Sequence, residues 1–161
     1  MTTGDRTSAQ LAEEQARLVL PSLSEADAVD LGLRTLALAR ERELAVTIEV
    51  RRTGRVVFRA ALPGTSPDND DWVARKARVV ERFGRSTLHE RVRHEEAGTT
   101  FADKTGLPES QYAAHGGGVP LEVAGTGMVG VLLVSGLPQV ADHELCVEAI
   151  EGHLAAYAAR G

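Results

Sequence analysis

The stretch from residue 115 to residue 143 constrains the fold more than any other part of this 161-residue chain. It holds three consecutive glycines, Gly116 to Gly118, then two apolar segments separated by Gly125-Thr126-Gly127, and then an apolar-periodic segment. Glycines gather where backbone must approach backbone, or a ligand, without a Cβ in between. The stretch therefore predicts a Gly-rich loop leading into a β-hairpin, with a final helix beginning where the second strand ends. If the chain has a binding site, we expect it here.

Hydrophobic periodicity predicts the other elements. Apolar and polar side chains alternate on both sides of Thr53-Gly54, which is typical of a second hairpin. Ser24 followed by Asp27 indicates the start of a helix. The expected helices span residues 7–20, 24–43, 68–83, 86–94 and 139–159; the expected strands lie within 44–61 and at 99–101, 118–124 and 128–135; residues 108–114 are expected to form a helical turn. Strands in hairpins, with helices between them, favour an α+β fold whose antiparallel sheet is covered by helices, and they argue against a Rossmann fold.

Composition limits the classes of protein to consider. The length predicts a single domain over residues 1–161, with residues 1–21 as an N-terminal helical extension. A net charge of −5 argues against a nucleic-acid surface, and the lone Cys146 excludes an intrachain disulfide and a multi-cysteine metal site. No apolar run reaches the roughly 18 to 20 residues of a membrane helix, and the first residues lack the apolar core of a signal peptide. We therefore expect a cytoplasmic protein without nucleic-acid or membrane partners.

Four features are candidates for chemistry. The glycine triplet could form a nest of N–H groups for an anion, or simply a tight turn. His115, at the mouth of that loop, could ligate a metal or haem iron, act as an acid or base, or be an exposed residue without a task. His143 follows Asp142 at a helix start, where the macrodipole favours a neutral imidazole, or it could cap and pack. Lys76 sits on an apolar helical stripe, so we expect it near a carboxylate or the Gly-rich loop.

The remaining reactive side chains favour structural interpretations. His89 and His94 lie in a charged segment that predicts a solvated face, and His153 falls off the main apolar stripe. Cys146 is expected to be a buried free thiol, although its spacing from His143 also allows a thiolate pair. Four arginines in and just after the expected 68–83 helix are explained by local ion pairing on a solvated or subunit-facing helix: Arg75, Arg78, Arg82 and Arg85.

Several motifs together resemble a known family. They are Asp68-Asn69-Asp70-Asp71-Trp72 with Arg75-Lys76, Tyr112-Ala113-Ala114-His115-Gly116-Gly117-Gly118-Val119-Pro120, Val134-Ser135-Gly136-Leu137-Pro138 and Asp142-His143. From about Ser24 to its end, the chain looks like the uncharacterised branch of the haem-degrading-domain superfamily, which also holds GlcG-like, HbpS-like and PduO C-terminal-like proteins. The resemblance implies a profilin-like α-β-α sandwich, a homo-oligomer built from dimers, and a family label of haem binding or degradation.

The topology suggests where a site would form. An antiparallel pair brings the start of one strand beside the end of its partner, so the Gly-rich loop and the start of the last helix are expected to converge. This placement predicts a small-molecule-binding protein with an anionic ligand, and the family resemblance adds haem as a candidate ligand. The amphipathic first helix and the exposed faces or edges of the sheet predict a homo-oligomer with the N-terminal helices at subunit interfaces. The candidate ligand-binding residues are Lys76, His115, Gly116, Gly117, Gly118 and His143, with His115 or His143 as a haem ligand. The alternatives are a non-catalytic protein-interaction scaffold and, with less support, an enzyme acting on a small metabolite.

Overall fold

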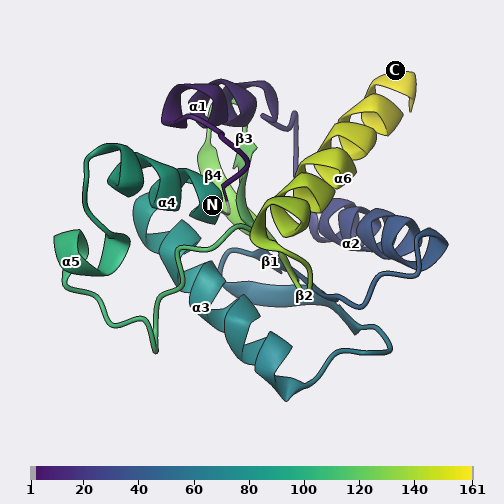
Figure 1. The fold of residues 1–161 in the computed structure, drawn as a ribbon. Coiled ribbons are helices and arrows are strands. Elements are labelled where there is room, and N and C mark those ends of the chain that lie inside the picture. Colours follow the sequence, from purple (N-terminus) through teal and green to yellow (C-terminus); the bar gives the residue numbers. More distant parts are fainter. Residues whose placement is uncertain (1–2, 161) are drawn as a thin grey trace.

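A four-stranded antiparallel sheet forms the centre of the protein, seen here in a computed structural model that describes residues 3–160 (Figure 1). Its strands are β1 (Thr47–Arg52), β2 (Arg55–Ala61), β3 (Gly118–Val123) and β4 (Gly127–Ser135), in the order β2-β1-β4-β3. Both predicted hairpins are present, and they join through β1 and β4, which pair from Thr47 opposite Ser135 to Arg52 opposite Gly130. Each hairpin therefore supplies one edge strand of the sheet, β2 at one end and β3 at the other.

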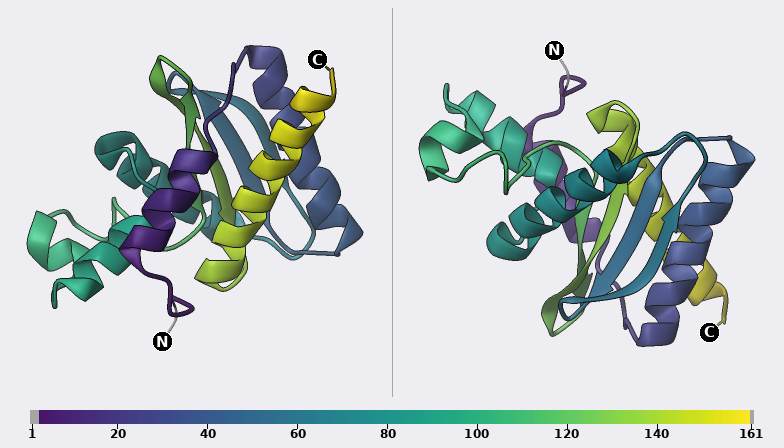
Figure 2. Two further views of the ribbon diagram at one scale, coloured as in Figure 1. Left: turned by 90° about the horizontal axis from the view of Figure 1, so that it is seen from above. Right: turned by 90° about the horizontal axis from the view of Figure 1, so that it is seen from below.

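Helices cover both faces of this sheet. They are α1 (Ser8–Arg17), α2 (Glu25–Glu41), α3 (Pro67–Phe83), α4 (Thr87–Glu96), α5 (Phe101–Thr105) and α6 (Gln139–Arg160). Helices α2 and α6 lie side by side on one face, while α3 lies on the other with α4 and α5 beyond it (Figure 2). The predicted α+β sandwich is confirmed. Among residues 3–160, none of the helices is long and apolar enough to cross a membrane.

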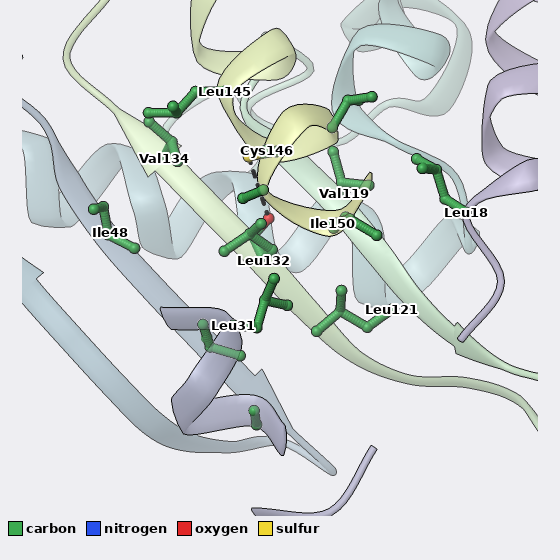
Figure 3. Packing of buried hydrophobic residues seen from close by; sticks show 14 of the residues in the cluster. Leu18, Leu31, Ile48, Val119, Leu121, Leu132, Val134, Leu145, Cys146 and Ile150 are labelled. Atoms are coloured by element: carbon green, nitrogen blue, oxygen red, sulfur yellow. Dashed lines mark hydrogen bonds between the residues drawn. The ribbon is translucent and has the colours of Figure 1, made fainter. Parts of the chain in front are cut away.

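The alternation along β4 explains why this strand is apolar throughout. Leu132 and Val134 join the main core against α2 and α6, together with Ile150 (Figure 3). Val131 and Leu133 point the other way, into a second cluster with the apolar side chains of α3. A strand covered on both faces has no solvent side, so its sequence reads as a continuous apolar run.

Capping side chains set the helix starts. The Ser24 hydroxyl accepts from Asp27 N, and the Asp27 carboxylate accepts from Ser24 N, which confirms the predicted start of α2. The strand expected at residues 99–101 is wrong. Thr100 instead caps α5 by accepting from Asp103 N at 3.1 Å, so the threonine that favoured a strand starts a helix. The predicted turn at 108–114 is confirmed by the bond from Tyr112 N to Pro108 O.

Helix α1 spans from α4 to α6 and buries Leu11 against Leu88 and Val92. It ends at Arg17, earlier than expected, because Leu20 leaves the helix to pair with the edge of β3, where Leu20 N donates to Glu122 O at 2.7 Å. Docking of α1 on α4 also corrects the expectation of a solvated α4.

Buried histidines are the consequence of that packing. His89 is 8% exposed and His94 is 5% exposed, and the His94 ring packs edge-on against Phe101 with the ring centroids 5.6 Å apart. His94 also contacts the buried Glu90 carboxylate at 3.3 Å. The charged residues around these histidines therefore surround a buried cluster, and the solvated face predicted for them is wrong.

Candidate functional site

The glycine triplet lies against the end of β4 and the start of α6. A Cβ on Gly117, whose φ is +124°, would come within 2.3 Å of Val134 O and 2.6 Å of Lys76 Nζ, and a Cβ on Gly116 would lie 2.2 Å from Gln139 O. Gly116 N donates to Gln139 Oε1 at 3.1 Å, and Gly118 N donates to the Thr87 hydroxyl. Because both N–H groups already have partners, the arrangement supports close packing as the reason for the glycines.

Lys76 and Asp142 form a buried ion pair behind this loop. Their side chains are each 3% exposed, and Lys76 Nζ lies 3.2 Å from Asp142 Oδ2. Lys76 Nζ also donates to Val134 O at 3.0 Å, while the Asp142 carboxylate accepts from Leu137 N at 2.9 Å. The expectation that Lys76 lies near a carboxylate or the Gly-rich loop is confirmed on both counts, since Lys76 contacts Asp142 and packs under Gly117.

Burial acts on both members of the pair. It lowers the pKa of the Lys76 ammonium, and the negative charge of Asp142 opposes that shift. It raises the pKa of the Asp142 carboxyl, and the charge of Lys76 and the hydrogen bond from Leu137 N oppose that shift. The charge of each group therefore opposes the shift that burial causes in the other, and removal of either leaves its partner buried without compensation.

His115 forms a wall together with Trp72 of α3. The two rings meet edge-on, with centroids 5.1 Å apart. Neither ring nitrogen of His115 makes a hydrogen bond to another residue in the described part of the chain. Burial, followed by the positive charges of Arg91 and Lys76, lowers the pKa of His115. The imidazole is therefore neutral near pH 7, with a lone pair free to bind a metal or accept a proton.

Two cavities meet at the Trp72–His115 wall. The first, which we call the loop recess, has a volume of about 270 Å³. It is lined by Asn69, Trp72, Lys76, His115, Ser135, Gly136, Leu137, Gln139 and Asp142. The second, the aromatic recess, has a volume of about 160 Å³ and lies on the α4–α5 side of the wall, among Arg75, Arg91, Phe101 and Tyr112. His115 and Trp72 contribute to both cavities.

His143 does not join this wall. Its side chain is 1% exposed, and its Nε2 lies 2.5 Å from Glu14 Oε1 on α1. His115 contacts α3 on one side of the sheet, whereas His143 belongs to α6 on the other. The Gly-rich loop and the start of α6 do converge, as expected, but α6 presents Asp142 to the loop recess, and His143 holds α1. The structure thus brings Lys76, His115 and the glycines together and leaves out the second imidazole.

Several lining residues were missed by the sequence reasoning. Asn69 and Trp72 precede the predicted Lys76 by seven and four residues, so one side of α3 carries all three, and this spacing was the available signal. Ser135 and Asp142 had no such signal, because their places depend on how β4 and α6 meet. The solvated alternative expected for Arg75 is wrong, since its guanidinium stacks over Trp72 at 4.0 Å from the ring centroid and its side chain is 14% exposed. Its predicted pairing with Asp71 is confirmed at 2.8 Å.

Cys146 lies under the same loop and is fully buried. Its Sγ contacts Gly117 O at 3.6 Å and Leu132 O at 3.9 Å, the latter contact being visible in Figure 3. Burial raises the pKa of the thiol well above its ordinary value. Its predicted role as a buried free thiol is confirmed. Among residues 3–160 there is also no group of three or more His, Cys, Asp and Glu side chains placed to hold a metal ion.

Comparison with protein families and curated sequences gives consistent results. A family model described as haem degrading protein HbpS-like matches residues 23–151, so α1 lies outside the matched part. A UPF0303 protein of Streptomyces coelicolor is 51% identical over 145 residues, which cover 90% of this chain and 92% of the relative. A UPF0303 protein of Burkholderia cenocepacia is 51% identical over 139 residues, covering 86% and 84% of the two chains.

Solved structures share the fold. The Ybr137w protein matches with a TM-score of 0.86 at 27% identity, over 92% of this chain and 88% of that one. PduOC in complex with heme matches with a TM-score of 0.68 at 19% identity, over 81% and 94%. HbpS matches with a TM-score of 0.63 at 21% identity, over 82% and 89%. At these last two identities the likeness concerns the fold alone.

Proposed function

This chain belongs to the HbpS-like haem-degrading protein family, and we propose that it binds a small anionic ligand in the loop recess, with the His115 ring N–H as a hydrogen-bond donor to the anion. The observation that carries the proposal is the His115 imidazole, half-buried, neutral near pH 7 and unpaired at the border of a cavity. An unpaired imidazole at the border of a cavity, beside other polar side chains, is a candidate ligand-binding group.

The other lining groups suit an anion. Two of the three Lys76 protons have partners in Val134 O and Asp142, which leaves one donor. The Ser135 hydroxyl and the Asn69 amide lie 3.4 Å apart in the same recess, so each has further hydrogen-bonding capacity for a guest. A carboxylate or similar group placed here would receive hydrogen bonds from neutral and charged donors together.

The loop recess offers a nitrogen ligand for haem iron but is too small to enclose a porphyrin. A neutral His115 is a suitable haem-iron ligand, and the family description and the haem complex of PduOC support haem as a candidate. The loop recess, at about 270 Å³, is smaller than the roughly 300–1,000 Å³ of cavities that enclose drug-sized ligands. A porphyrin therefore exceeds the recess of a single chain, and we assign the recess to a smaller anion, with haem as the alternative.

Paired titrations separate these ligands. Haem binding would be followed by a shift of the Soret band, and acetate, pyruvate and oxalate by calorimetry, in wild type, His115→Gln and His153→Gln. His153 is a buried histidine that lines neither recess, so its variant controls for the loss of an imidazole elsewhere. We expect saturable binding of at least one small anion, about tenfold weaker in His115→Gln and unchanged in His153→Gln.

Two results would contradict the proposal: no saturable binding of any of these anions, or equal affinity in wild type and His115→Gln. A Soret shift that His115→Gln abolishes, without binding of the small anions, would replace the proposed ligand by haem.

We also propose that the protein is a homo-oligomer built from dimers that form through the β2–α2 side. Strand β2 ends the sheet with one edge unpaired, and the exposed apolar side chains Val56 and Leu33 belong to β2 and α2. The N-terminal helix, where the sequence suggested an interface, already buries Leu11 within its own chain. Light scattering at micromolar concentration should give at least a dimer, and Val56→Lys should lower the mass; a wild-type monomer would refute this.

A further inference from the structure

The aromatic recess has a composition that the proposed function does not use. It lies between α3, α4, α5 and the 108–115 segment, on the far side of the Trp72–His115 wall from the loop recess. Trp72, Phe101 and Tyr112 supply aromatic surface, while Arg75 and Arg91 supply guanidinium groups. Aromatic walls beside cationic donors are the combination that recognises a planar, negatively charged group.

Arg75 is held in place by contacts on several sides. Its guanidinium stacks on Trp72, its Nε lies 2.8 Å from the Asp71 carboxylate, and its Nη1 donates to Glu109 O at 3.1 Å. Its side chain is 14% exposed. Its Nη2 has no hydrogen-bond partner within residues 3–160. A guanidinium fixed in this way loses little conformational freedom when it binds a guest.

Arg91 faces the same cavity from α4. Its Nε lies 3.1 Å from Glu95 Oε1, and its side chain is 30% exposed. Both of its Nη atoms lack hydrogen-bond partners in the described part of the chain, so the two-donor edge of the guanidinium is open. Such an edge matches the two oxygens of a carboxylate. Glu95 and Glu109 also line the recess, and both are exposed residues.

The size of the cavity limits the guest. At about 160 Å³ it is close to the roughly 150 Å³ of an engineered cavity that binds benzene. One aromatic ring therefore fills it, and a fused or macrocyclic system does not fit inside. The edge-on contact between His115 and Trp72 closes the side toward the loop recess.

We propose that the aromatic recess is a second binding site, which takes a single-ring aromatic carboxylate. The ring packs among Trp72, Phe101 and Tyr112, and the carboxylate pairs with the open edge of Arg91 and with Nη2 of Arg75. This site does not require the loop recess to bind anything, because none of its charged donors contributes to that cavity.

The sequence provides a direct reporter, because Trp72 is the single tryptophan of the chain. Its fluorescence would be followed while benzoate, or its neutral analogue benzamide, is titrated into wild type, Arg91→Met and Arg93→Met. Arg93 lies two positions along the same helix, is exposed, and lines neither recess, so Arg93→Met is the matched control. Thermal unfolding of each variant checks that the fold is intact. Arg91→Lys keeps the positive charge but removes the two-donor edge of the guanidinium, and it replaces Arg91→Met in the titrations if that variant does not fold.

We expect a saturable change of Trp72 fluorescence with benzoate, weakened about tenfold by Arg91→Met, weakened also by Arg91→Lys, and unchanged in Arg93→Met. Benzamide should bind about tenfold more weakly than benzoate to wild type. No saturable response to benzoate up to about 10 mM would overturn the proposal. Equal benzoate affinity in wild type and folded Arg91 variants would also overturn it. The loop recess is tested with haem and small aliphatic anions in His115→Gln, and the aromatic recess with benzoate in the Arg91 variants. A negative result at one recess therefore leaves the result at the other unaffected.

Discussion

Replacing Lys76 with Met should destabilise the protein by about 3 kcal/mol at pH 8. The substitution leaves the Asp142 carboxylate buried without its cation, and a broken buried ion pair costs about 3–5 kcal/mol. We place the loss at the lower end because Asp142 keeps hydrogen bonds from Leu137 N and Gly136 N. Met is close to Lys in volume, so no large cavity adds to the cost. For a chain of this length, the loss corresponds to about 6–12 °C in Tm.

The pH dependence of this loss has a definite sign. Burial raises the pKa of Asp142, and Lys76→Met removes the charge that opposes this shift. A carboxyl whose folded pKa is raised destabilises the fold once pH exceeds its unfolded value, and protonation at lower pH removes that cost. The difference in unfolding free energy between wild type and Lys76→Met should therefore be smaller at pH 5 than at pH 8.

Urea unfolding followed by Trp72 fluorescence measures both quantities, at one protein concentration throughout. Lys104→Met, an exposed lysine replaced on α5, is the control and should change stability by less than about 0.5 kcal/mol. The double variant Lys76→Met/Asp142→Leu should recover most of the loss, because no unpaired charge remains. A loss below about 1 kcal/mol for Lys76→Met, or a loss that grows from pH 8 to pH 5, would refute the reasoning.

Three further predictions follow from the same contacts. Gly117→Ala should lower the free energy of unfolding by more than about 3 kcal/mol in chemical denaturation, because its Cβ would lie 2.3 Å from a carbonyl oxygen at a φ of +124°. Gly125→Ala, in an open turn, should lower it by only about 1 kcal/mol. Equal losses in the two variants would contradict this. Burial raises the pKa of Glu14, but the hydrogen bond and charge of His143 outweigh burial and hold that pKa below 4.5. The pair therefore stabilises the fold above pH 4.5, and this stabilisation disappears as pH falls through the lowered pKa of the folded state. Hydrogen exchange should therefore show residues 8–17 losing protection in acid, and Glu14→Gln should remove this dependence; an unchanged acid transition in Glu14→Gln would rule the pair out. The Cys146 thiol, with its raised pKa and full burial, should react with a thiol reagent only at the rate of unfolding, and rapid labelling of native protein would show the burial to be wrong.

The hairpins and most helices were predictable because their signals are local. The alternation around Thr53-Gly54 and the Ser24–Asp27 capping pair are each contained within a few residues, and tertiary contacts did not override them. The strand expected at 99–101 failed because Thr100 is equally suited to a strand and to a helix cap. Without a neighbouring strand to pair with, the cap prevailed.

The site was predictable only in part. Hairpin topology placed the Gly-rich loop beside the end of β4. The isolated charge of Lys76 on an apolar stripe predicted a nearby carboxylate or the Gly-rich loop, and Lys76 contacts both. The partner of His143 could not be found, because Glu14 is 129 positions away on α1 and no pattern links them. Adjacent helical residues point about 100° apart, so the helix start that brings Asp142 to the recess turns His143 away from it.

The most direct test of the account is a crystal structure of the protein with the small anion that binds most tightly in the titrations. We predict density for the anion inside the loop recess, in contact with His115 and with at least one of Lys76, Asn69 and Ser135. Density at another surface, with the loop recess empty at saturating ligand, would contradict the claim that this cavity is the ligand-binding site.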